Sequence, residues 1–385
     1  MLLLGVISLF ADMTYESARS ITGPYLAILG ASATAVGIIA GLGELIGYGL
    51  RIVSGIISDR IHRHWAITIA GYAVNLLAVP ALALAGSWEI AAVLIMTERF
   101  GKAIRTPTRD AMLSHAAHGL GRGWAFGIHE AMDQIGAMIG PIIVAAVLAW
   151  KGSYKFGFSV LAVPALLALA VLAVARISYP QPHDLEPSFR ALEASGLRST
   201  FWFYLMAVAC IALGFADYPL VAFHMKTEAI VADKWIPLIY AGAMGVDALS
   251  ALAFGRLYDK KGFPVLLVMI AASAWSAPLV FLTGPVLLIF GVALWGIGMG
   301  AQESIIRASV ADIVPRDRRA AGYGVFNAGF GLAWFAGSTI IGLLYDRSLT
   351  ALAVFSVVSQ LASLPLLYSV QKRLHTKKPK VDQKR

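Results

Sequence analysis

Apolar stretches of about 20 residues recur along the whole chain, and they leave few folds open to it. A helix of that length crosses the roughly 30 Å of hydrocarbon in a bilayer. With 58% apolar and 14% charged residues, 385 residues could not cover a soluble core with polar surface. The sequence therefore predicts an all-α, polytopic membrane protein. Its twelve expected spans lie near residues 2–27, 33–57, 66–86, 88–112, 122–149, 156–176, 199–222, 235–257, 264–283, 285–310, 320–343 and 349–370.

The basic residues indicate how the spans are oriented. Most Lys and Arg residues lie in alternate turns and after the last span, and the opposite turns hold few. By the positive-inside rule we expect both termini in the cytoplasm and the chain in the inner (plasma) membrane. The net charge of +9 is explained by this placement and by a basic tail that lies against anionic lipid. We therefore expect no nucleic-acid partner, and the first span, which lacks a basic leader, is not a cleaved signal peptide.

The chain is divided into two similar halves. Residues 177–198 are rich in Pro and charged residues, which indicates a cytoplasmic linker. We expect a six-helix bundle over 1–176, a second over 199–370 and a basic cytoplasmic tail over 371–385. Four markers recur in the same order at offsets of 197 to 205 residues, among them Phe-Ala-Asp at 10–12 and again at 215–217. Parallel repeats of this kind place a substrate site at their interface, near the bilayer midplane.

Two charged turns show the same pattern, with Gly55, Asp59 and Arg60 in the first half and Gly255, Asp259 and Lys260 in the second. They resemble the loop signature G-x-x-x-D-[RK]-x-G-[RK] of the major facilitator superfamily, although His62 replaces the second Gly in the first copy. The resemblance covers the whole chain and implies twelve transmembrane helices in two pseudo-symmetric bundles. It also implies a cytoplasmic latch for the outward-open state, in which Asp59 pairs with Arg105 or Arg109, and Asp259 with Arg307.

The fifth span contains a more specific motif. Gly127, Gly136, Gly140 and Pro141 match G-x8-G-x3-G-P, which resembles the antiporter signature of facilitator drug exporters; Val144 and Ala145 replace its closing Gly-Gly. Small residues on one helix face allow close packing, so we expect this helix to press against a helix of the other bundle, with a bend at Pro141. Ordinary tight packing, as in any transporter, is the alternative interpretation.

Charged residues within the spans are candidates for function. A charge that faces lipid costs several kcal/mol, so these side chains must face a cavity or opposite charges. Asp12, Glu16 and Arg19 share one helical face, and we expect Glu44 to pair with a basic residue of another helix. Carboxylates buried in this way can carry protons, although a structural ion network is the competing interpretation. The predicted proton-coupling site in the central cavity comprises Asp12, Glu16, Arg19, Glu44, Glu98, Arg99, Glu130, Asp133 and Asp217.

The second half offers a candidate substrate wall. Its eleventh span contains four aromatic residues, which could line a cavity for an apolar substrate or could pack in the core or against lipid: Phe326, Phe330, Trp334 and Phe335. The sequence does not distinguish these two roles.

We therefore expect a secondary transporter that works by alternating access, most simply as a monomer, and exports a small amphipathic or drug-like molecule in exchange for protons. The chain lacks H-E-x-x-H, G-x-S-x-G and P-loop patterns, so we expect no enzyme activity, no cofactor and no use of ATP. Proton-coupled uptake of a small anion is an alternative, because Arg51 and Lys102 add to the arginines of the spans. Metal transport is a weaker alternative, since Cys and His do not cluster and we expect no bound metal. A receptor that binds a ligand without transporting it is a further alternative.

Overall fold

A computed structural model describes residues 2–61, 64–116, 122–179, 199–315 and 318–375, and every regular element in them is helical. Each predicted span corresponds to one helix or to consecutive helical segments. The first half consists of α1 (Leu2–Ile28), α2 (Ala33–Ile61), α3 (His64–Ala81) with η1 (Leu82–Leu84), α4 (Trp88–Ala116), α5 (Arg122–Lys151), α6 (Tyr154–Val160) and α7 (Ala162–Ser178). The second half consists of α8 (Ser199–Gly214), α9 (Tyr218–Thr227), α10 (Trp235–Lys261), α11 (Phe263–Ser273), α12 (Ser276–Phe281), α13 (Pro285–Gly300), η2 (Ala301–Ile306), α14 (Arg307–Ile313), α15 (Arg319–Tyr345) and α16 (Leu349–His375).

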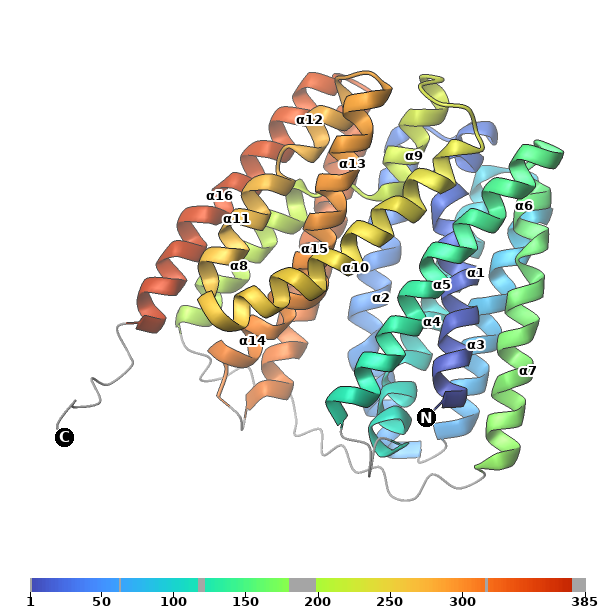
Figure 1. The fold of residues 1–385 in the computed structure, drawn as a ribbon, viewed down its shortest axis with the longest axis horizontal. Coiled ribbons are helices and arrows are strands. Elements are labelled where there is room, and N and C mark those ends of the chain that lie inside the picture. Colours follow the sequence, from blue (N-terminus) through green and yellow to red (C-terminus); the bar gives the residue numbers. More distant parts are fainter. Residues whose placement is uncertain (1, 62–63, 117–121, 180–198, 316–317, 376–385) are drawn as a thin grey trace.

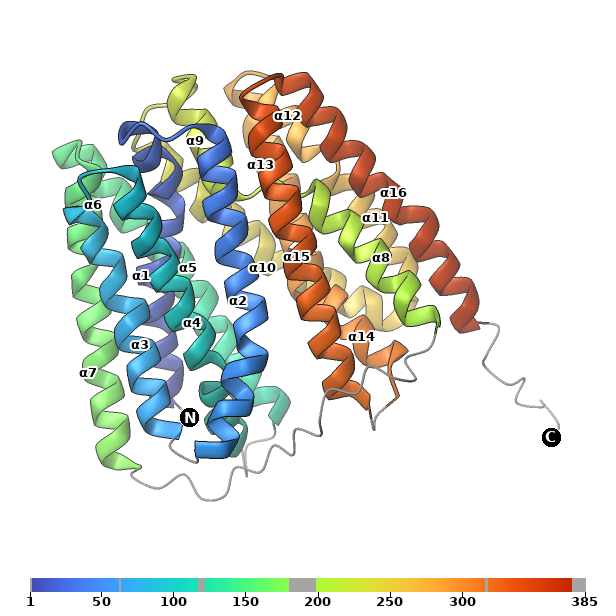
Figure 2. The ribbon, with the colours of Figure 1, turned by 180° about the vertical axis from the view of Figure 1, so that it is seen from behind.

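The two halves form two bundles side by side, here called the N-lobe (α1–α7) and the C-lobe (α8–α16) (Figures 1 and 2). The start of α1 and the end of α16 lie on one side of the molecule, here called the termini side (Figure 1). The lobes approach each other on the opposite side and diverge toward the termini side. The expected linker lies almost entirely in 180–198, outside the described residues, as does the tail beyond His375. The helix α16 continues five residues past the expected end of the last span.

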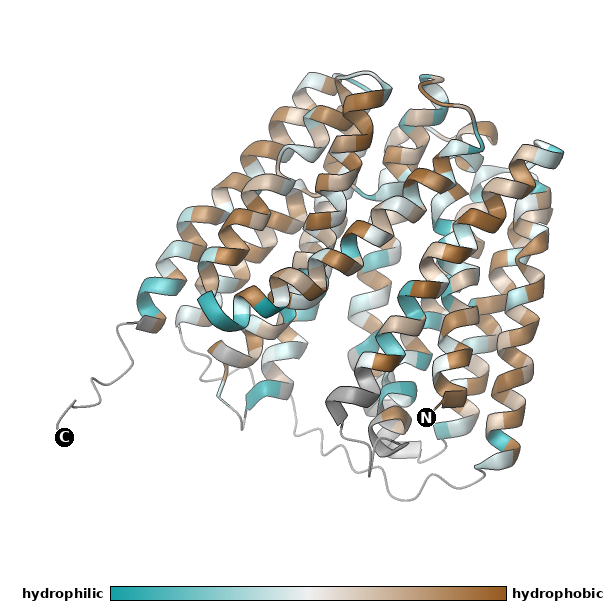
Figure 3. Ribbon diagram, viewed as in Figure 1, coloured by the Kyte–Doolittle hydropathy of each residue, from teal (hydrophilic) through white to brown (hydrophobic). Residues whose placement is uncertain are grey.

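Two helices in the middle of the N-lobe carry an unusual number of charges. In the described part of the chain, ten helices are long and apolar enough to cross a membrane by length and composition alone, and α1 and α4 are not among them. Both are long enough, with 27 and 29 residues, but charged residues interrupt their apolar sequence. In Figure 3 the outer helix α7 is mostly hydrophobic, whereas hydrophilic positions recur on helices next to the interface between the lobes. The charged residues of α1 and α4 therefore lie in the protein interior, away from lipid.

The lobes are joined closely through α2 and α15. A Cβ atom added at Gly37 would lie 2.3 Å from the carbonyl oxygen of Ser338, and one at Gly41 would lie 3.0 Å from the Cα atom of Phe335. Only small residues allow two helix backbones to approach to this extent. The second contact lies between α1 and α9, where a Cβ atom at Gly23 would lie 1.8 Å from the carbonyl oxygen of Pro219.

The glycines of α5 pack differently from the prediction. A Cβ atom at Gly136 would lie 2.3 Å from the carbonyl oxygen of Leu9, and one at Gly140 would lie 2.5 Å from that of Met13. Both partners belong to α1 of the same lobe, so the prediction that this glycine face meets the other bundle is wrong. Gly127 has no atom within 4 Å of an added Cβ, and α5 continues through Pro141 as one helix.

Where α5 does meet the C-lobe, it uses a large side chain, and the glycine belongs to the partner helix. A Cβ atom added at Gly245 of α10 would lie 3.3 Å from the terminal methyl group of Met138. The close approach of small residues to the other bundle is therefore made by α1 and α2, and α5 contributes to it through a longer and more flexible side chain.

Candidate functional site

A cavity of about 500 Å³ lies between the lobes, from mid-depth toward the termini side. The N-lobe contributes side chains from α1, α2, α4 and α5, and the C-lobe contributes side chains from α10, α13, η2 and α14. Twelve of the 22 lining residues are Asp, Glu, Lys or Arg, seven acidic and five basic. Because charged side chains are stable at this depth only where water or opposite charges reach them, such a lining indicates a path for polar solutes or ions.

Ion pairs close the inner end of this cavity. Glu44 of α2 lies 3.4 Å from Arg19 of α1 and 3.2 Å from Arg99 of α4, so it pairs with basic residues of two other helices, as expected. The Arg99 side chain also lies 3.2 Å from Glu98, and Arg19 lies 3.6 Å from Asp217 of the C-lobe. The network therefore joins three helices of the N-lobe to the C-lobe.

Neutral hydrogen-bond donors bind two carboxylates of this network, those of Asp217 and Glu98. Asp217 lies where the helix breaks between α8 and α9, and one of its oxygens accepts hydrogen bonds from Trp334 Nε1 at 2.9 Å and Ser338 Oγ at 2.5 Å. Glu98 accepts a bond of 2.7 Å from Asn75 Nδ2 of α3. These donors would continue to hold each carboxylate if an arginine moved away.

A second contact between the lobes lies beside the first. Tyr240 of α10 donates its hydroxyl hydrogen to Glu16, one turn from Arg19 on α1. Both contacts thus use charged residues of α1. Any event that changes the charge of Glu16 or Asp217 changes the attraction between the lobes at mid-depth.

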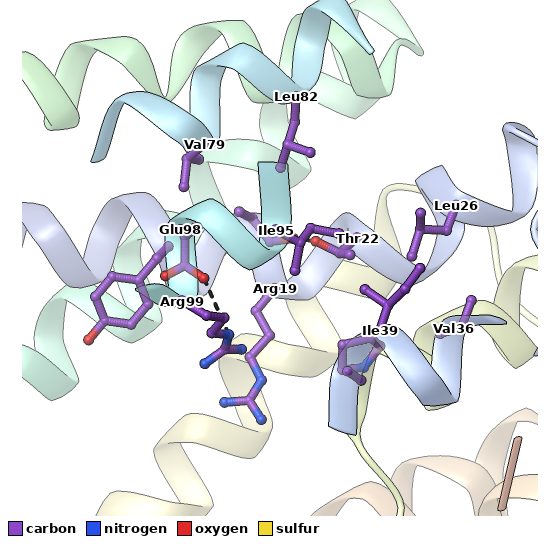
Figure 4. Close-up of a pocket in the computed structure, with 14 residues that line it drawn as sticks. Arg19, Thr22, Leu26, Val36, Ile39, Val79, Leu82, Ile95, Glu98 and Arg99 are labelled. Atoms are coloured by element: carbon purple, nitrogen blue, oxygen red, sulfur yellow. Dashed lines mark hydrogen bonds and ion pairs between the residues drawn. The ribbon is translucent and has the colours of Figure 1, made fainter. Parts of the chain in front are cut away.

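A smaller cavity of about 40 Å³ lies behind this network, lined by N-lobe side chains and by Pro219 of α9 in the C-lobe (Figure 4). The guanidinium groups of Arg19 and Arg99 lie next to each other at its polar end, and Glu98 lies beside them. Apolar side chains line the other end: Leu26, Val36, Ile39, Val79, Leu82 and Ile95. The cavity has room for about one or two water molecules, which would sit against the charged groups.

The acidic residues of α5 lie nearer the termini side. Asp133 is 3.3 Å from His129 Nδ1, and Glu130 faces the main cavity from the same helix. Asp12 of α1 also lines the cavity, and its Oδ1 atom is buried without a hydrogen-bond partner. Lys102 Nζ lies 3.6 Å from the centre of the Tyr15 ring and forms no ion pair among the described residues. The nine predicted site residues therefore gather in two connected places, the network at the inner end and the cavity wall.

The sequence pattern of the Major Facilitator Superfamily matches residues 4–338 and 234–385. The chain belongs to this superfamily. An uncharacterised protein of Mycobacterium tuberculosis is 43% identical over 376 residues, which cover 95% of this chain and 91% of that protein. The fosmidomycin resistance protein of Escherichia coli is 25% identical over 323 residues, 72% of this chain and 77% of that protein. Among solved structures, a mutant of the nucleoside transporter NupG matches with a TM-score of 0.80 at 14% identity, over 95% of this chain and 99% of that one.

As a facilitator, the chain is a secondary transporter, and its predicted latch can be compared with the structure. The side chains of Asp59 and Arg60 lie outside the described residues. Arg105 is fully buried, its guanidinium group lies 4.2 Å from the centre of the Tyr72 ring, and it has no hydrogen-bond partner among the described residues. Arg109 binds the neighbouring Asp110 at 2.8 Å.

The second copy of the latch is not formed in this conformation. Asp259 and Lys260 are exposed at the end of α10, and Gly255 lies one turn earlier on the same helix. Arg307 lines the central cavity and donates a hydrogen bond of 3.4 Å to the Tyr48 hydroxyl. The expected pair between Asp259 and Arg307 is therefore absent from the described structure, because the two side chains lie in different environments.

Several contacts of the facilitator could not be assigned from its sequence. Tyr240, Trp334 and Ser338 look like ordinary residues of apolar spans, whereas Asn75 stands out as a polar residue inside a span and could have been noticed. The candidate aromatic wall lines no part of the 500 Å³ cavity: Phe326 and Phe330 stack on each other at 5.7 Å inside the C-lobe. Among the described residues, no group of three or more His, Cys, Asp or Glu side chains is arranged to hold a metal ion.

Proposed function

We propose that this facilitator exports a small, charged or amphipathic molecule in exchange for protons, by alternating access between its two lobes. One observation carries the proposal: the mid-depth contacts between the lobes, Arg19 with Asp217 and Tyr240 with Glu16, use carboxylate oxygens. A proton on either carboxylate removes the charge that attracts its partner. Proton binding and contact between the lobes thus compete for the same atoms.

The composition of the ion network supports a role for protons. Two arginines, Arg19 and Arg99, are surrounded by three carboxylates, Glu44, Glu98 and Asp217. With one negative charge in excess, the network can accept one proton and still leave each arginine a carboxylate partner. Because a proton that binds one conformation more tightly than the other shifts their equilibrium, this network can couple proton movement to the motion of the lobes.

One feature favours export, and another favours a termini side that faces the cytoplasm. The relative in Escherichia coli is named for resistance to fosmidomycin, which accords with removal of a compound from the cell. The bias of Lys and Arg toward the termini side favours a cytoplasmic location of both termini in the inner membrane. The cavity lies between the two lobes of one chain, and we propose that the protein transports as a monomer.

The test uses purified protein in liposomes with an imposed pH gradient and a pH dye inside. Organic cations, amphipathic drugs, sugars, organic acids and divalent metal ions are added one at a time. We expect at least one substrate to dissipate the gradient by exchange, with little exchange in Asp217→Asn and Glu16→Gln. The control variant is Glu89→Gln, which removes an exposed carboxylate at the start of α4, far from the cavity, and should retain the rate.

The direction of proton movement decides between export and uptake. Protons that move with an anionic substrate, in the same direction, would contradict exchange and favour uptake, which the cationic residues Arg51 and Lys102 of the cavity would serve. Substrate flux that is unchanged in both carboxylate variants would contradict the coupling role. Binding of a ligand without any flux would favour a receptor.

A further inference from the structure

Two arginines converge on one tyrosine at the interface between the lobes. The guanidinium carbon of Arg51, on α2, lies 5.3 Å from the centre of the Tyr48 ring. Arg307, at the start of α14 in the C-lobe, donates a hydrogen bond of 3.4 Å to the hydroxyl of the same tyrosine. Both arginines line the 500 Å³ cavity, so a molecule inside it can reach them.

Tyr48 is held firmly between the lobes. Its ring packs edge-on against Phe330 of α15, with 5.2 Å between the ring centres. A Cβ atom added at Gly331 would lie 3.1 Å from the Cβ atom of Tyr48, so the two helices leave little room here. The tyrosine therefore fixes the position at which the two guanidinium groups meet.

Among the described residues, neither Arg51 nor Arg307 forms an ion pair within 4.0 Å, and Arg51 Nε is buried without a hydrogen-bond partner. Glu303, one turn before Arg307, lines the same cavity and attracts the Arg307 charge from a longer distance. The two arginine charges repel each other. By contrast, Arg19, Arg99 and Arg109 of the same region each bind a carboxylate. Two like charges from opposite lobes, both in contact with Tyr48 and neither within 4.0 Å of a carboxylate in the described residues, favour binding of an anion between them.

We propose that Arg51 and Arg307 form the subsite for the anionic group of the transported molecule, a carboxylate or phosphate whose oxygens bind one guanidinium group from each lobe. This inference rests on the proposed transport function and specifies its substrate class. We also expect an empty carrier to close slowly on the termini side, because closure would bring α2 and α14 together and a bound anion would offset the repulsion between the two arginines.

The test measures binding without transport. Inorganic phosphate and acetate serve as probes, each titrated against sodium chloride of equal ionic strength, and the thermal unfolding temperature of the purified protein is recorded. We expect at least one probe to raise this temperature with a saturable dependence that chloride does not reproduce. In Arg51→Gln and in Arg307→Gln, the half-saturating concentration should rise at least tenfold. Arg51→Lys and Arg307→Lys, which keep the charge but lose the two-pronged donor, should weaken binding less.

Arg256→Gln is the matched control, because this arginine is exposed on α10 and should leave binding unchanged. A phosphate or acetate effect that persists in both Gln variants, or a response no different from that to chloride, would overturn the proposed subsite. Proton exchange in liposomes is measured on the same preparations. Intact exchange without anion binding would refute the subsite alone, whereas saturable binding without exchange would support the subsite and refute the transport function.

Discussion

Asp346, at the end of α15, caps the first turn of α2 across the interface between the lobes. Its carboxylate accepts hydrogen bonds from the backbone N–H groups of Ala33 at 3.2 Å and Thr34 at 2.9 Å, and from the Thr34 hydroxyl at 2.6 Å. Backbone N–H groups at a helix start have no partner within the helix, and the helix dipole favours an anion there. We therefore expect Asp346→Ala to weaken closure of the lobes on the side away from the termini.

The size of this effect can be worked out from the contacts. When the lobes separate, both groups regain water, so only the net value of the cap is lost. Removal of a capping side chain costs about 0.5–2 kcal/mol, and the hydroxyl bond adds about 1 kcal/mol. A loss of about 1.5–3 kcal/mol corresponds to a change of roughly 10- to 150-fold in the equilibrium between the two conformations. Asp346→Asn loses the charge and one of the two acceptor oxygens, so its effect should exceed the roughly 0.3–1 kcal/mol that is typical of charge at a helix end and stay below that of Asp346→Ala.

Pulsed electron-spin distance measurements can test this prediction. Spin labels at Leu84 and Val286, both exposed and in different lobes, would report separation on the side away from the termini, in a chain with Cys210→Ser. We expect the population at longer distances to increase in the order wild type, Asp346→Asn, Asp346→Ala. Glu228→Gln, which removes an exposed carboxylate at the end of α9, is the control. Equal distributions in wild type and Asp346→Ala would refute the argument.

Three further predictions follow from the packing and the ion network. Gly140→Ala should lower the free energy of unfolding by about 1–3 kcal/mol, because its Cβ would lie 2.5 Å from the backbone of α1. Gly127→Ala should raise this free energy by about 0.5–1 kcal/mol, since no described atom lies within 4 Å of the added Cβ. Thermal unfolding in detergent measures both, and a change of equal sign would contradict the packing argument. Arg19→Gln should cost about 3 kcal/mol in the same measurement, because it removes the partner of two buried carboxylates, and Arg19→Lys should cost less. In the distance measurement, Asp217→Asn should reduce the pH dependence of the populations near neutral pH, whereas Asp346→Ala should shift the populations and retain that dependence.

The number and limits of the spans could be predicted because a helix needs about 20 mostly apolar residues to cross the hydrocarbon core of the bilayer. Each expected span overlaps an observed helix or a set of consecutive segments, even for α1, where charges interrupt the apolar run. Breaks inside spans could not be predicted. The Phe-Ala-Asp sequences at 10–12 and 215–217 are identical, yet the first is within an unbroken helix and the second lies at the break between α8 and α9. The local sequence permits both, and packing decides between them.

Site residues could be predicted as a group, since charged residues within spans must meet in the interior. Their partners could not, because pairing depends on how each helix is rotated. We expect Glu44 to pair with a basic residue of another helix, but the sequence does not distinguish among Arg19, Arg99 and Lys102. The prediction made from the glycines of α5 was wrong for the same reason. A face of small residues shows that another helix is near, but it does not show which helix that is.

The contacts between the lobes differ in kind with depth, and this difference explains how protons could control the transporter. On the side away from the termini, the lobes are joined by backbone approaches at Gly23 and Gly37 and by the cap from Asp346. At mid-depth they are joined through Glu16 and Asp217, which lie in or beside the cavity that ions can enter. The contacts on the side away from the termini favour closure of the lobes on that side, and this preference depends mainly on packing and on the capped start of α2. Under the proposed coupling, a proton or a substrate would weaken the mid-depth contacts, and when this preference is nearly balanced, that change would decide which side is open.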